Sequence, residues 1–464
     1  MTETAKSTDK MVEKPAKASP LAALKEEMAP KPAPVAPKPV VAAAKAKKAV
    51  AVMTDGMKAM ALAKATILKG TGHRPLAPMT TQYPHVSTGS TIVNSLIGGV
   101  KLKDGRPMCP GFPRRRITEV YGPESSGKTT LVLQSIVEVQ KEGGVVVFLD
   151  FEHSLHHGYA KQIGVDFSED KILYYQPDTM EEGFKMMYLA LKAGVDLIAL
   201  DSIAAMVPHD ELIKKLDDVA KIGAVAKKMS ETLPKMVSWL AKLPSDGTGE
   251  NAKPKAGHPG TALVLINQER AVISTGGGGG APEPNTSGGK ALKYFCYLRL
   301  RLNRFKTEKV ERTDPITGKK RLLPFGNVTQ VKVVKSKIDG KQGYDANIFI
   351  RFGFGIDDIY SVIESGAGRG LIKKEGAYYQ YGEHRFQGRD KMRTHLLANP
   401  KLAAEIQQKV ADLIVADAQP ISDEELSEED AMLAELAAEG LGGDDDIGMN
   451  LEPEEVVVSS SDDE

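Results

Sequence analysis

Residues 117–131 read Ile-Thr-Glu-Val-Tyr-Gly-Pro-Glu-Ser-Ser-Gly-Lys-Thr-Thr-Leu. An apolar strand, Ile117–Tyr121, leads into Gly122–Thr129, which matches the pattern G-x-x-x-x-G-K-[ST] at every fixed position. A helix-like run, Thr129–Val139, follows. A phosphate-binding loop, or P-loop, requires this order, because the N–H groups of the turn and the helix N-terminus both attract phosphate oxygens. The stretch therefore predicts an α/β fold that binds a nucleotide.

Within this loop each residue type has a chemical reason. Lys128 can reach the β and γ phosphates, and the Thr129 hydroxyl is placed to ligate Mg²⁺. The candidate nucleotide-binding residues of the loop are Gly122, Pro123, Glu124, Ser125, Ser126, Gly127, Lys128, Thr129 and Thr130.

Two carboxylates follow other buried strands. Asp201 ends the apolar run Leu197–Leu200, where a second acidic residue is expected to support the metal together with Thr129. Glu152 comes just after the apolar run that ends at Asp150, and parallel sheets form their ligand crevice at such strand ends. Glu152 is therefore the candidate for activating water, although a helix N-cap or ion-pair role is an alternative on spacing alone.

The composition of the 464 residues, 41% hydrophobic and 26% charged, is that of an ordinary globular protein. The net charge of zero hides +7 in residues 1–70 and −18 in residues 417–464, which leaves +11 for the middle of the chain. A basic middle suits a polyanionic ligand. No apolar run approaches the roughly 18 residues of a membrane span, and Cys109 and Cys296 lie far apart. We expect a cytoplasmic protein without a membrane partner.

Short apolar runs separated by helix-length segments predict a largely parallel sheet in the middle of the chain. Among these runs are 116–121, 144–150, 195–201 and 262–267. Composition and apolar patterning divide the chain into a disordered Lys/Pro/Ala-rich arm (1–52), a helix and linker (53–85), an α/β core that carries the P-loop (86–338), a small α+β domain (339–416) and an acidic disordered tail (417–464).

Further motifs are collinear with the P-loop: Asp150–Leu155, Tyr159–Asp166, Gln176–Thr179, Leu265–Gln268 and Val331–Lys337. Together they resemble the bacterial-type RecA recombinase family, from bacteria or phages, over roughly residues 75 to 415. The resemblance implies a RecA-like P-loop ATPase core with a central, mostly parallel sheet, a small α+β C-terminal domain and disordered termini. It assigns subunit packing to the helix and linker at 53–85.

The resemblance also implies an activity. The chain would be a DNA-dependent ATPase that uses ATP and Mg²⁺, forms helical homo-oligomeric filaments on single-stranded DNA, and pairs them with homologous double-stranded DNA for strand exchange in DNA repair. Single-strand-binding or loading proteins are further expected partners.

Carried over by motif, the resemblance gives roles to single residues. Glu152 activates water, Gln268 senses the γ-phosphate, and Tyr159 stacks on adenine. Lys335 and Lys337 reach the ATP of a neighbouring subunit, so the expected catalytic set is Lys128, Glu152, Gln268, Lys335 and Lys337. Asp201 and Thr129 hold the metal.

Two segments are candidate DNA loops. Residues 270–290 form a long polar stretch rich in Gly and Pro, and loops of this length are usually functional or disordered. It resembles the second DNA loop of the family, and its candidate DNA-binding residues are Arg270, Thr286, Gly288, Gly289 and Lys290. The first loop is expected near 214–230, with Lys227 among its basic residues, and a solvated helix face is the alternative there.

One departure from the family is His156, which stands where an acid is expected near the adenine. Two other functions share some of these features. A hexameric RecA-fold helicase would have the same P-loop and Asp201, and a nucleotide-gated DNA-binding scaffold would need no turnover.

Overall fold

The computed structural model describes residues 55–71, 82–99, 101–102, 104–213, 223–244, 257–270, 285–313, 316–338 and 342–417. The expected N-terminal arm and all of the expected acidic tail except Asp417 lie outside these residues. The chain divides into two compact units between Ala77 and Pro78. The first contains α1 (Asp55–Thr71), which confirms the helix predicted there.

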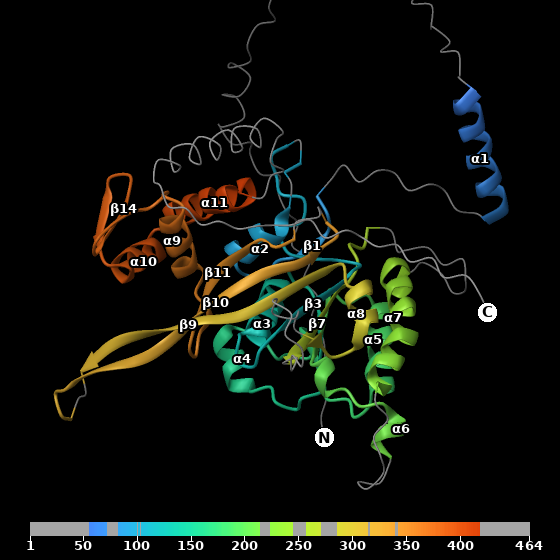
Figure 1. Ribbon diagram of the computed structural model, residues 1–464, viewed down its shortest axis with the longest axis horizontal. Coiled ribbons are helices and arrows are strands. Elements are labelled where there is room, and N and C mark those ends of the chain that lie inside the picture. The colour runs from blue at the N-terminus through green and yellow to red at the C-terminus, as the bar shows by residue number, and fades with distance from the viewer. Residues whose placement is uncertain are drawn as a thin grey trace, which may run out of the picture. The chain divides into compact units, whose positions relative to one another are not determined.

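The second unit is built on one large mixed sheet (Figure 1). Among the described residues it has ten strands in the order β12-β11-β10-β9-β3-β7-β6-β4-β5, with β8 paired to β7. Its strands are β3 (Ile117–Gly122), β4 (Val146–Asp150), β5 (Ile172–Tyr175), β6 (Leu197–Asp201), β7 (Ala262–Arg270), β8 (Asn285–Thr286), β9 (Leu298–Thr313), β10 (Lys320–Ser336), β11 (Asp345–Arg351) and β12 (Gly355–Ile356).

The half of the sheet from β3 to β5 is parallel, as predicted. Alternate residues of its strands enter two separate apolar cores, one on each face. In β4, for example, Phe148 packs on one face and Leu149 on the other. Burial on both faces explains why these strands read as continuous apolar runs.

Helices cover both faces. The first core includes side chains of α2 (Thr91–Gly98), α3 (Lys128–Lys141) and α4 (His157–Ile163). The second includes α5 (Met180–Ala193), α7 (Ala224–Lys242) and α8 (Gly289–Phe295). A 3-10 turn, Ile203–Ala205, and the short α6 (His209–Leu212) follow β6.

The other half of the sheet is antiparallel and was not predicted. β9 runs parallel to β3, but β10 returns antiparallel to β9, and β11 and β12 continue the antiparallel order. β9 and β10 are 16 and 17 residues long and form a ribbon that leaves the body of the sheet (Figure 1).

The C-terminal part contains α9 (Asp358–Gly368), a small antiparallel sheet, α10 (Arg389–Ala398) and α11 (Pro400–Ala416). The small sheet comprises β13 (Lys373–Glu375), β14 (Tyr378–Tyr381) and β15 (His384–Gln387). These helices and strands agree with the mixed α+β character predicted for this part of the chain. Val362 and Ile406 share one apolar core with α2 and α3, so this part packs directly on the large sheet.

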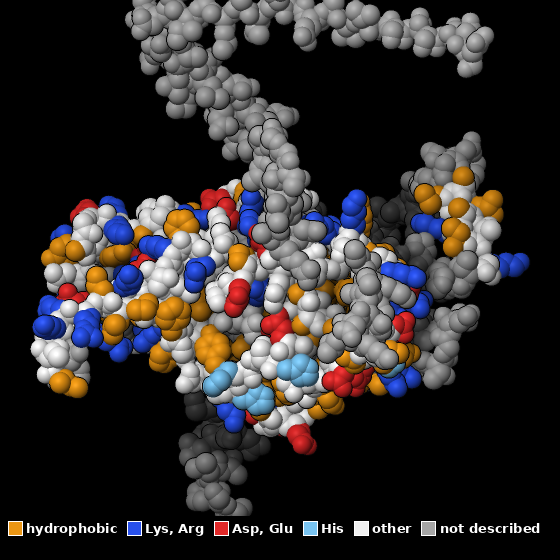
Figure 2. Space-filling view, turned by 60° about the horizontal axis from the view of Figure 1, so that its bottom comes forward, with side chains coloured by type: hydrophobic (Ala, Val, Ile, Leu, Met, Phe, Trp, Pro, Cys, Tyr) orange, Lys and Arg blue, Asp and Glu red, His pale blue; other side chains and the backbone are white. Residues whose placement is uncertain are grey.

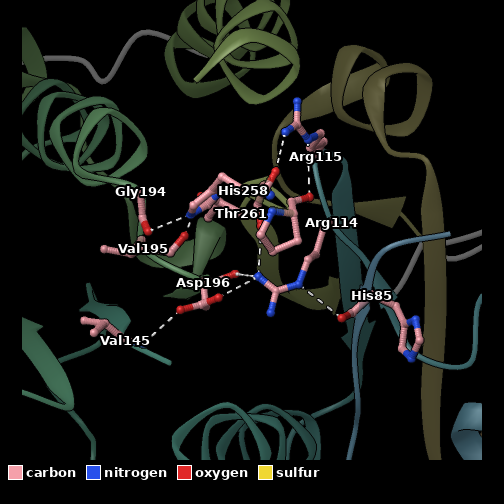
Figure 3. Close-up of polar contacts among 11 residues, drawn as sticks. His85, Arg114, Arg115, Val145, Gly194, Val195, Asp196, His258 and Thr261 are labelled. Carbon is pink, nitrogen blue, oxygen red and sulfur yellow. Dashed lines mark hydrogen bonds and ion pairs between the residues drawn. The ribbon is translucent and has the colours of Figure 1, made fainter. Parts of the chain in front are cut away.

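At the amino ends of the parallel strands, Arg114 links three segments (Figure 3). It follows the short strand β2 (Phe112–Pro113), which pairs with β1 (His85–Val86). Its guanidinium donates to Asp196 Oδ1 at 2.8 Å, to the Gly260 carbonyl at 2.9 Å and to the His85 carbonyl at 3.1 Å. Because Arg114 is 6% exposed, these bonds replace its hydration.

Among the described helices, none has the length and apolar character that a bilayer crossing requires.

Candidate nucleotide and DNA site

The P-loop joins β3 to α3 in the conformation that a nest of N–H groups requires. Ser125 and Gly127 both have left-handed backbone angles, with φ of 58° and 93°. A Cβ on Gly127 would lie 2.2 Å from Ile350 Cδ1 and would force that side chain to move, and the left-handed φ itself favours glycine here. The loop therefore presents its backbone at the N-terminus of α3, where phosphate is attracted.

Lys128 is the first residue of α3 and is only 8% exposed. Its Nζ donates to the carbonyl oxygens of Gly122, at 3.1 Å, and Pro123, at 2.7 Å. Burial lowers the pKa of Lys128, and the nearby charge of Asp201 opposes this shift. The ammonium is thus held inside the loop, where phosphate oxygens are expected to bind.

Thr129 and Asp201 meet across the site. The Thr129 hydroxyl donates to Asp201 Oδ2 at 2.6 Å. Burial raises the pKa of Asp201 to about 6, and the negative charge of Glu152 acts in the same direction. Asp201 is therefore a buried carboxylate at the end of β6, and the described residues offer it no ion pair.

Glu152 and Gln268 are brought together from two strand ends. Gln268 Nε2 donates to Glu152 Oε1 at 2.7 Å. The Ser202 hydroxyl donates to the same oxygen. Ser202, which follows the candidate metal-supporting residue Asp201, was missed in the sequence, where nothing distinguishes it from a loop serine.

Asp150 shapes the turn that carries Glu152 and was also missed. It is buried, and its Oδ2 accepts hydrogen bonds from the Tyr174 hydroxyl at 2.8 Å and the Leu155 N–H at 3.1 Å. Burial and the bond to Asp150 raise the pKa of Tyr174. In the sequence Asp150 reads only as the end of a strand.

Tyr159 lies beside the P-loop helix. Its hydroxyl is 3.0 Å from Thr130 Oγ1, and burial raises the pKa of Tyr159. His156 is the N-cap of α4, where its Nδ1 accepts the Tyr159 N–H at 3.0 Å. The residue that departs from the family therefore helps to position the residue expected at the adenine.

Lys335 lies near the end of β10 and Lys337 just beyond it, at the edge of the sheet opposite the P-loop. Lys335 Nζ donates to the carbonyls of Lys293 and Tyr294 at the end of α8, at 2.5 and 3.0 Å. Burial and the charge of Lys337 lower the pKa of Lys335. Neither side chain contacts Lys128 or Asp201 among the described residues.

The two expected DNA loops adjoin one cavity. It has a volume of about 490 Å³ and is lined by Ala226 at the start of α7 and by Thr286, Gly288 and Gly289 before α8. Gly288 and Gly289 have left-handed φ angles of 90° and 70°. A Cβ on Gly289 would lie 2.9 Å from Ala226 Cβ, so the two segments pack closely.

The basic residues of these loops differ in availability. Lys227 and Lys290 are exposed, whereas Lys228 forms a 2.9 Å ion pair with Glu181. Arg270 ends β7 opposite Asn285, and Thr286 pairs with Glu269. Residues 214–222 and 271–284, which hold the rest of both expected loops, lie outside the described residues.

A buried polar network underlies Gln268. Asn267 Nδ2 donates at 2.8 Å both to Glu119 Oε1 and to the Ser287 carbonyl, next to Gly288. Glu119 is fully buried and accepts Arg299 Nε at 2.6 Å. The network joins β3, β7 and β9 to the residues before α8. Sequence analysis missed Glu119 and Arg299, because each reads as one polar residue within an apolar strand.

The fold and the P-loop define an α/β nucleotide-binding ATPase. Family models identify the group: the RecA N-terminal domain matches residues 58–357 and the RecA C-terminal domain matches residues 360–415. The chain belongs to the RecA family.

Curated relatives agree. The chain is 38% identical over 317 residues to Protein RecA of Leifsonia xyli subsp. xyli, covering 68% of this chain and 80% of the relative. It is 37% identical over 367 residues to Protein RecA of Salinispora tropica, and this match covers 78% of this chain and 94% of the relative. A crystal structure of the RadB recombinase aligns with a TM-score of 0.37 and 21% identity over 58% of this chain and 98% of that one. The chain is an ATP-dependent DNA recombinase and a DNA-dependent ATPase.

Proposed function

We propose that this recombinase forms a helical filament on single-stranded DNA, with ATP bound between neighbouring subunits, and exchanges strands with homologous duplex DNA. It acts in recombinational repair in the cytoplasm. The proposed parts are the core and the small C-terminal domain expected from the sequence, except that β11 and β12, which the expected boundary at 338/339 gave to the small domain, belong to the large sheet. Single-strand-binding or loading proteins would act on such a filament.

The observation that carries this proposal is the hydrogen bond from Gln268 to Glu152. Gln268 lies near the end of β7, which leads to the expected second DNA loop, and Glu152 is the proposed water-activating group. A single bond therefore connects the candidate hydrolytic residue with the strand that enters the DNA loop. Asn267 reaches the far end of the same loop through the Ser287 carbonyl.

Mg²⁺ fits the residues at this site. Asp201 is a buried carboxylate with a raised pKa, and a cation would stabilise its charged form. Thr129 Oγ1 is within 2.6 Å of it and supplies a second hard oxygen. Among the described residues no cluster of three or more His, Cys, Asp or Glu could cage a metal. This suits Mg²⁺, which usually binds through one or two protein oxygens and the phosphates.

The residues then have distinct tasks in hydrolysis. Mg²⁺, when bound, would neutralise charge on the phosphate oxygens. Lys128 supplies a positive charge at the β and γ phosphates, the P-loop N–H groups orient them, and Glu152 accepts a proton from the attacking water. Lys335 and Lys337 would act on the ATP of the neighbouring subunit. Such head-to-tail contacts generate a filament, because the same surfaces repeat without closing.

The test is ATP hydrolysis with and without single-stranded DNA over a salt series, with Lys128→Ala as the control. We expect strong stimulation by DNA that weakens with salt and is absent in the control. Hydrolysis that does not depend on DNA would separate the ATP site from the proposed loops. The family assignment does not favour the ring helicase or the scaffold.

A further inference from the structure

The side chain of Asn267 lies between the candidate DNA loop and the candidate hydrolytic residues. It is fully buried, and both N–H groups and the oxygen of its amide form hydrogen bonds. Its Nδ2 donates at 2.8 Å both to the Ser287 carbonyl and to Glu119 Oε1. Its Oδ1 accepts the backbone N–H of Gln268 at 2.9 Å. If one partner shifts, a buried polar group is left unpaired unless the amide moves with it.

Glu119 is the fixed point of this network. It lies within β3, it is fully buried, and its Oε2 accepts a hydrogen bond from Arg299 Nε at 2.6 Å. Figure 2 shows Lys and Arg side chains at the surface, where water hydrates them, whereas the side chain of Arg299 is only 6% exposed. The guanidinium of Arg299 stacks on Tyr121, 4.8 Å from the ring centroid. Because burying both charges removes their hydration, the pair is weak evidence for stability and indicates a role in fixing positions.

The network holds the chain on both sides of α8. Ser287 comes shortly before this helix and bonds to Asn267, and Arg299 comes shortly after it and bonds to Glu119. The helix is thereby attached to β3 and β7 by polar contacts as well as by apolar packing. The candidate DNA-binding glycines follow Ser287 directly. A shift of these glycines on DNA binding would therefore act on the amide of Asn267.

The same amide leads to the hydrolytic residues in two steps. Asn267 Oδ1 holds the backbone N–H of Gln268, and Gln268 Nε2 donates to Glu152 Oε1 at 2.7 Å. This route starts from the C-terminal end of the loop, at Ser287, whereas β7 itself leads into the N-terminal end. The loop is therefore connected to Gln268 at both of its ends.

We propose that Asn267 and Glu119 are positioning residues that transmit DNA binding at the C-terminal end of the second loop to Gln268, and through Gln268 to Glu152. Neither belongs to the candidate ATP-binding or DNA-binding residues, and each acts through residues that do. A shift of Ser287 moves the amide of Asn267, and Glu119 prevents that amide from rotating freely. The inference rests on the proposed function, because it requires DNA at this loop.

An exchange of the two side-chain types separates this role from stability. Glu119→Gln combined with Asn267→Asp keeps a carboxylate and the guanidinium of Arg299 in the core, and the new amide at position 119 can donate to the new carboxylate at position 267. That carboxylate still accepts the N–H of Gln268, but it has no N–H to donate to the Ser287 carbonyl. Each single substitution instead leaves two adjacent carboxylates or an unpaired guanidinium in the core, and should be less stable than the exchanged pair.

Three quantities are measured on full-length protein: the urea midpoint, the ratio of ATP turnover with and without single-stranded DNA, and the factor by which a non-hydrolysable ATP analogue raises the affinity for single-stranded DNA. We expect the midpoint of the exchanged pair to exceed those of both single variants. Its stimulation by DNA should nevertheless fall at least roughly tenfold, and its nucleotide-induced gain in DNA affinity, about 5- to 150-fold between coupled sites, should nearly vanish. ATP affinity without DNA should stay close to that of wild type.

Two further variants keep the test decisive if the exchanged pair does not fold. Asn267→Ala leaves the Glu119–Arg299 pair intact, adds no charge and should lose both forms of coupling. Arg114→Met is the control, because it breaks a buried ion pair at the amino ends of the strands and should lower the midpoint without changing either coupling.

Wild-type stimulation and a wild-type nucleotide effect in the exchanged pair, or in Asn267→Ala, would overturn the proposal, because neither variant can make the bond to Ser287. Equal losses of coupling in Arg114→Met would also overturn it, by assigning the effect to stability. Absence of stimulation by single-stranded DNA in the wild-type protein would instead count against the proposed function.

Discussion

The side-chain amide of Gln268 donates a 2.7 Å hydrogen bond to Oε1 of Glu152, across the ends of β7 and β4. A second hydrogen bond, from the Ser202 hydroxyl, reaches the same oxygen. Gln268, next to Asn267 in β7, and Ser202, next to Asp201 at the end of β6, thereby hold Glu152 in one orientation. Movement of the end of β7 would release one of these two bonds. DNA bound to the proposed loop after β7 would therefore alter Glu152, the proposed water-activating group.

We expect Gln268→Ala to uncouple hydrolysis from DNA. Basal ATP turnover should stay within a fewfold of wild type, because Glu152 remains, while stimulation by single-stranded DNA is lost. Glu152→Gln should instead lower stimulated turnover by roughly 10² to 10⁴, the range for removal of a general base. Gln162→Ala, at an exposed glutamine, is the control. DNA stimulation that persists in Gln268→Ala would contradict the coupling.

The next residue along β7 forms a second link. Glu269 accepts two hydrogen bonds from Arg301 of β9, at 2.9 and 2.7 Å, and pairs with Thr286 of β8. Such bidentate pairs fix geometry as well as charge. Arg301 is half-buried, so screening by water reduces but does not remove the interaction.

We predict that Glu269→Arg and Arg301→Glu each lower DNA-stimulated turnover, and that the exchanged pair restores much of it. The coupling free energy in a double-mutant cycle should be about 0.5 to 3 kcal/mol. Denaturant unfolding of the four proteins gives the stability cycle, and DNA-stimulated turnover gives the functional one. Strictly additive effects in both cycles would show that the pair does not position β7.

Sequence patterns predicted the parallel half of the sheet because its strands are buried on both faces and read as apolar runs. Phe148 and Leu149, which enter opposite cores, are examples. The antiparallel half was missed for the opposite reason. β9 alternates Leu298, Leu300 and Leu302 with Arg299 and Arg301 before it becomes polar, so only its first residues resemble a buried strand.

For the site, the P-loop residues could be predicted because phosphate chemistry fixes their spacing, and the structure brings Thr129 to Asp201 and Gln268 to Glu152. Glu119 and Arg299 could not be found in this way. They are 180 residues apart, and only the fold places one carboxylate against one guanidinium inside a core. Long-range polar pairs leave no local periodicity in a sequence.

Asp201→Asn should stabilise the ligand-free protein and weaken its response to Mg²⁺. Asparagine keeps an oxygen for the Thr129 hydroxyl but removes a buried charge that has no ion-pair partner among the described residues, a change of about 1 to 3 kcal/mol. Thermal unfolding with EDTA, with ATP, and with ATP plus Mg²⁺ separates the two effects. Asp178→Asn, at an exposed carboxylate, is the control. A ligand-free variant less stable than wild type would contradict the prediction.

Arg114→Met should destabilise the core by about 3 kcal/mol, the lower end for breaking a buried ion pair, because Asp196 is 24% exposed. The substitution also leaves the carbonyls of Gly260 and His85 without this donor (Figure 3). Denaturant unfolding measures the change. Arg106→Met breaks the exposed pair with Asp104 and should change stability little. Similar denaturant midpoints for Arg114→Met and Arg106→Met would show that Arg114 does not determine the stability of the core.

His85 should make the protein less stable as the pH falls. Burial is the largest influence on His85 and lowers its pKa. The contact of Nδ1 with the Tyr83 carbonyl, at 2.9 Å, and the charge of Glu142 raise the pKa of His85, and the charge of Arg114 lowers it. The folded pKa is thus below the unfolded value of about 6.5. The contribution of neutral His85 to the free energy of unfolding is fully present above that value. It is lost as the pH falls through the folded pKa, because the unfolded chain then binds the proton more readily.

Thermal unfolding from pH 7.5 to 5 should show a smaller decrease in the unfolding temperature of His85→Gln than of wild type. His209→Gln, at an exposed histidine, should follow wild type, and parallel curves for all three proteins would assign the acid sensitivity to other groups.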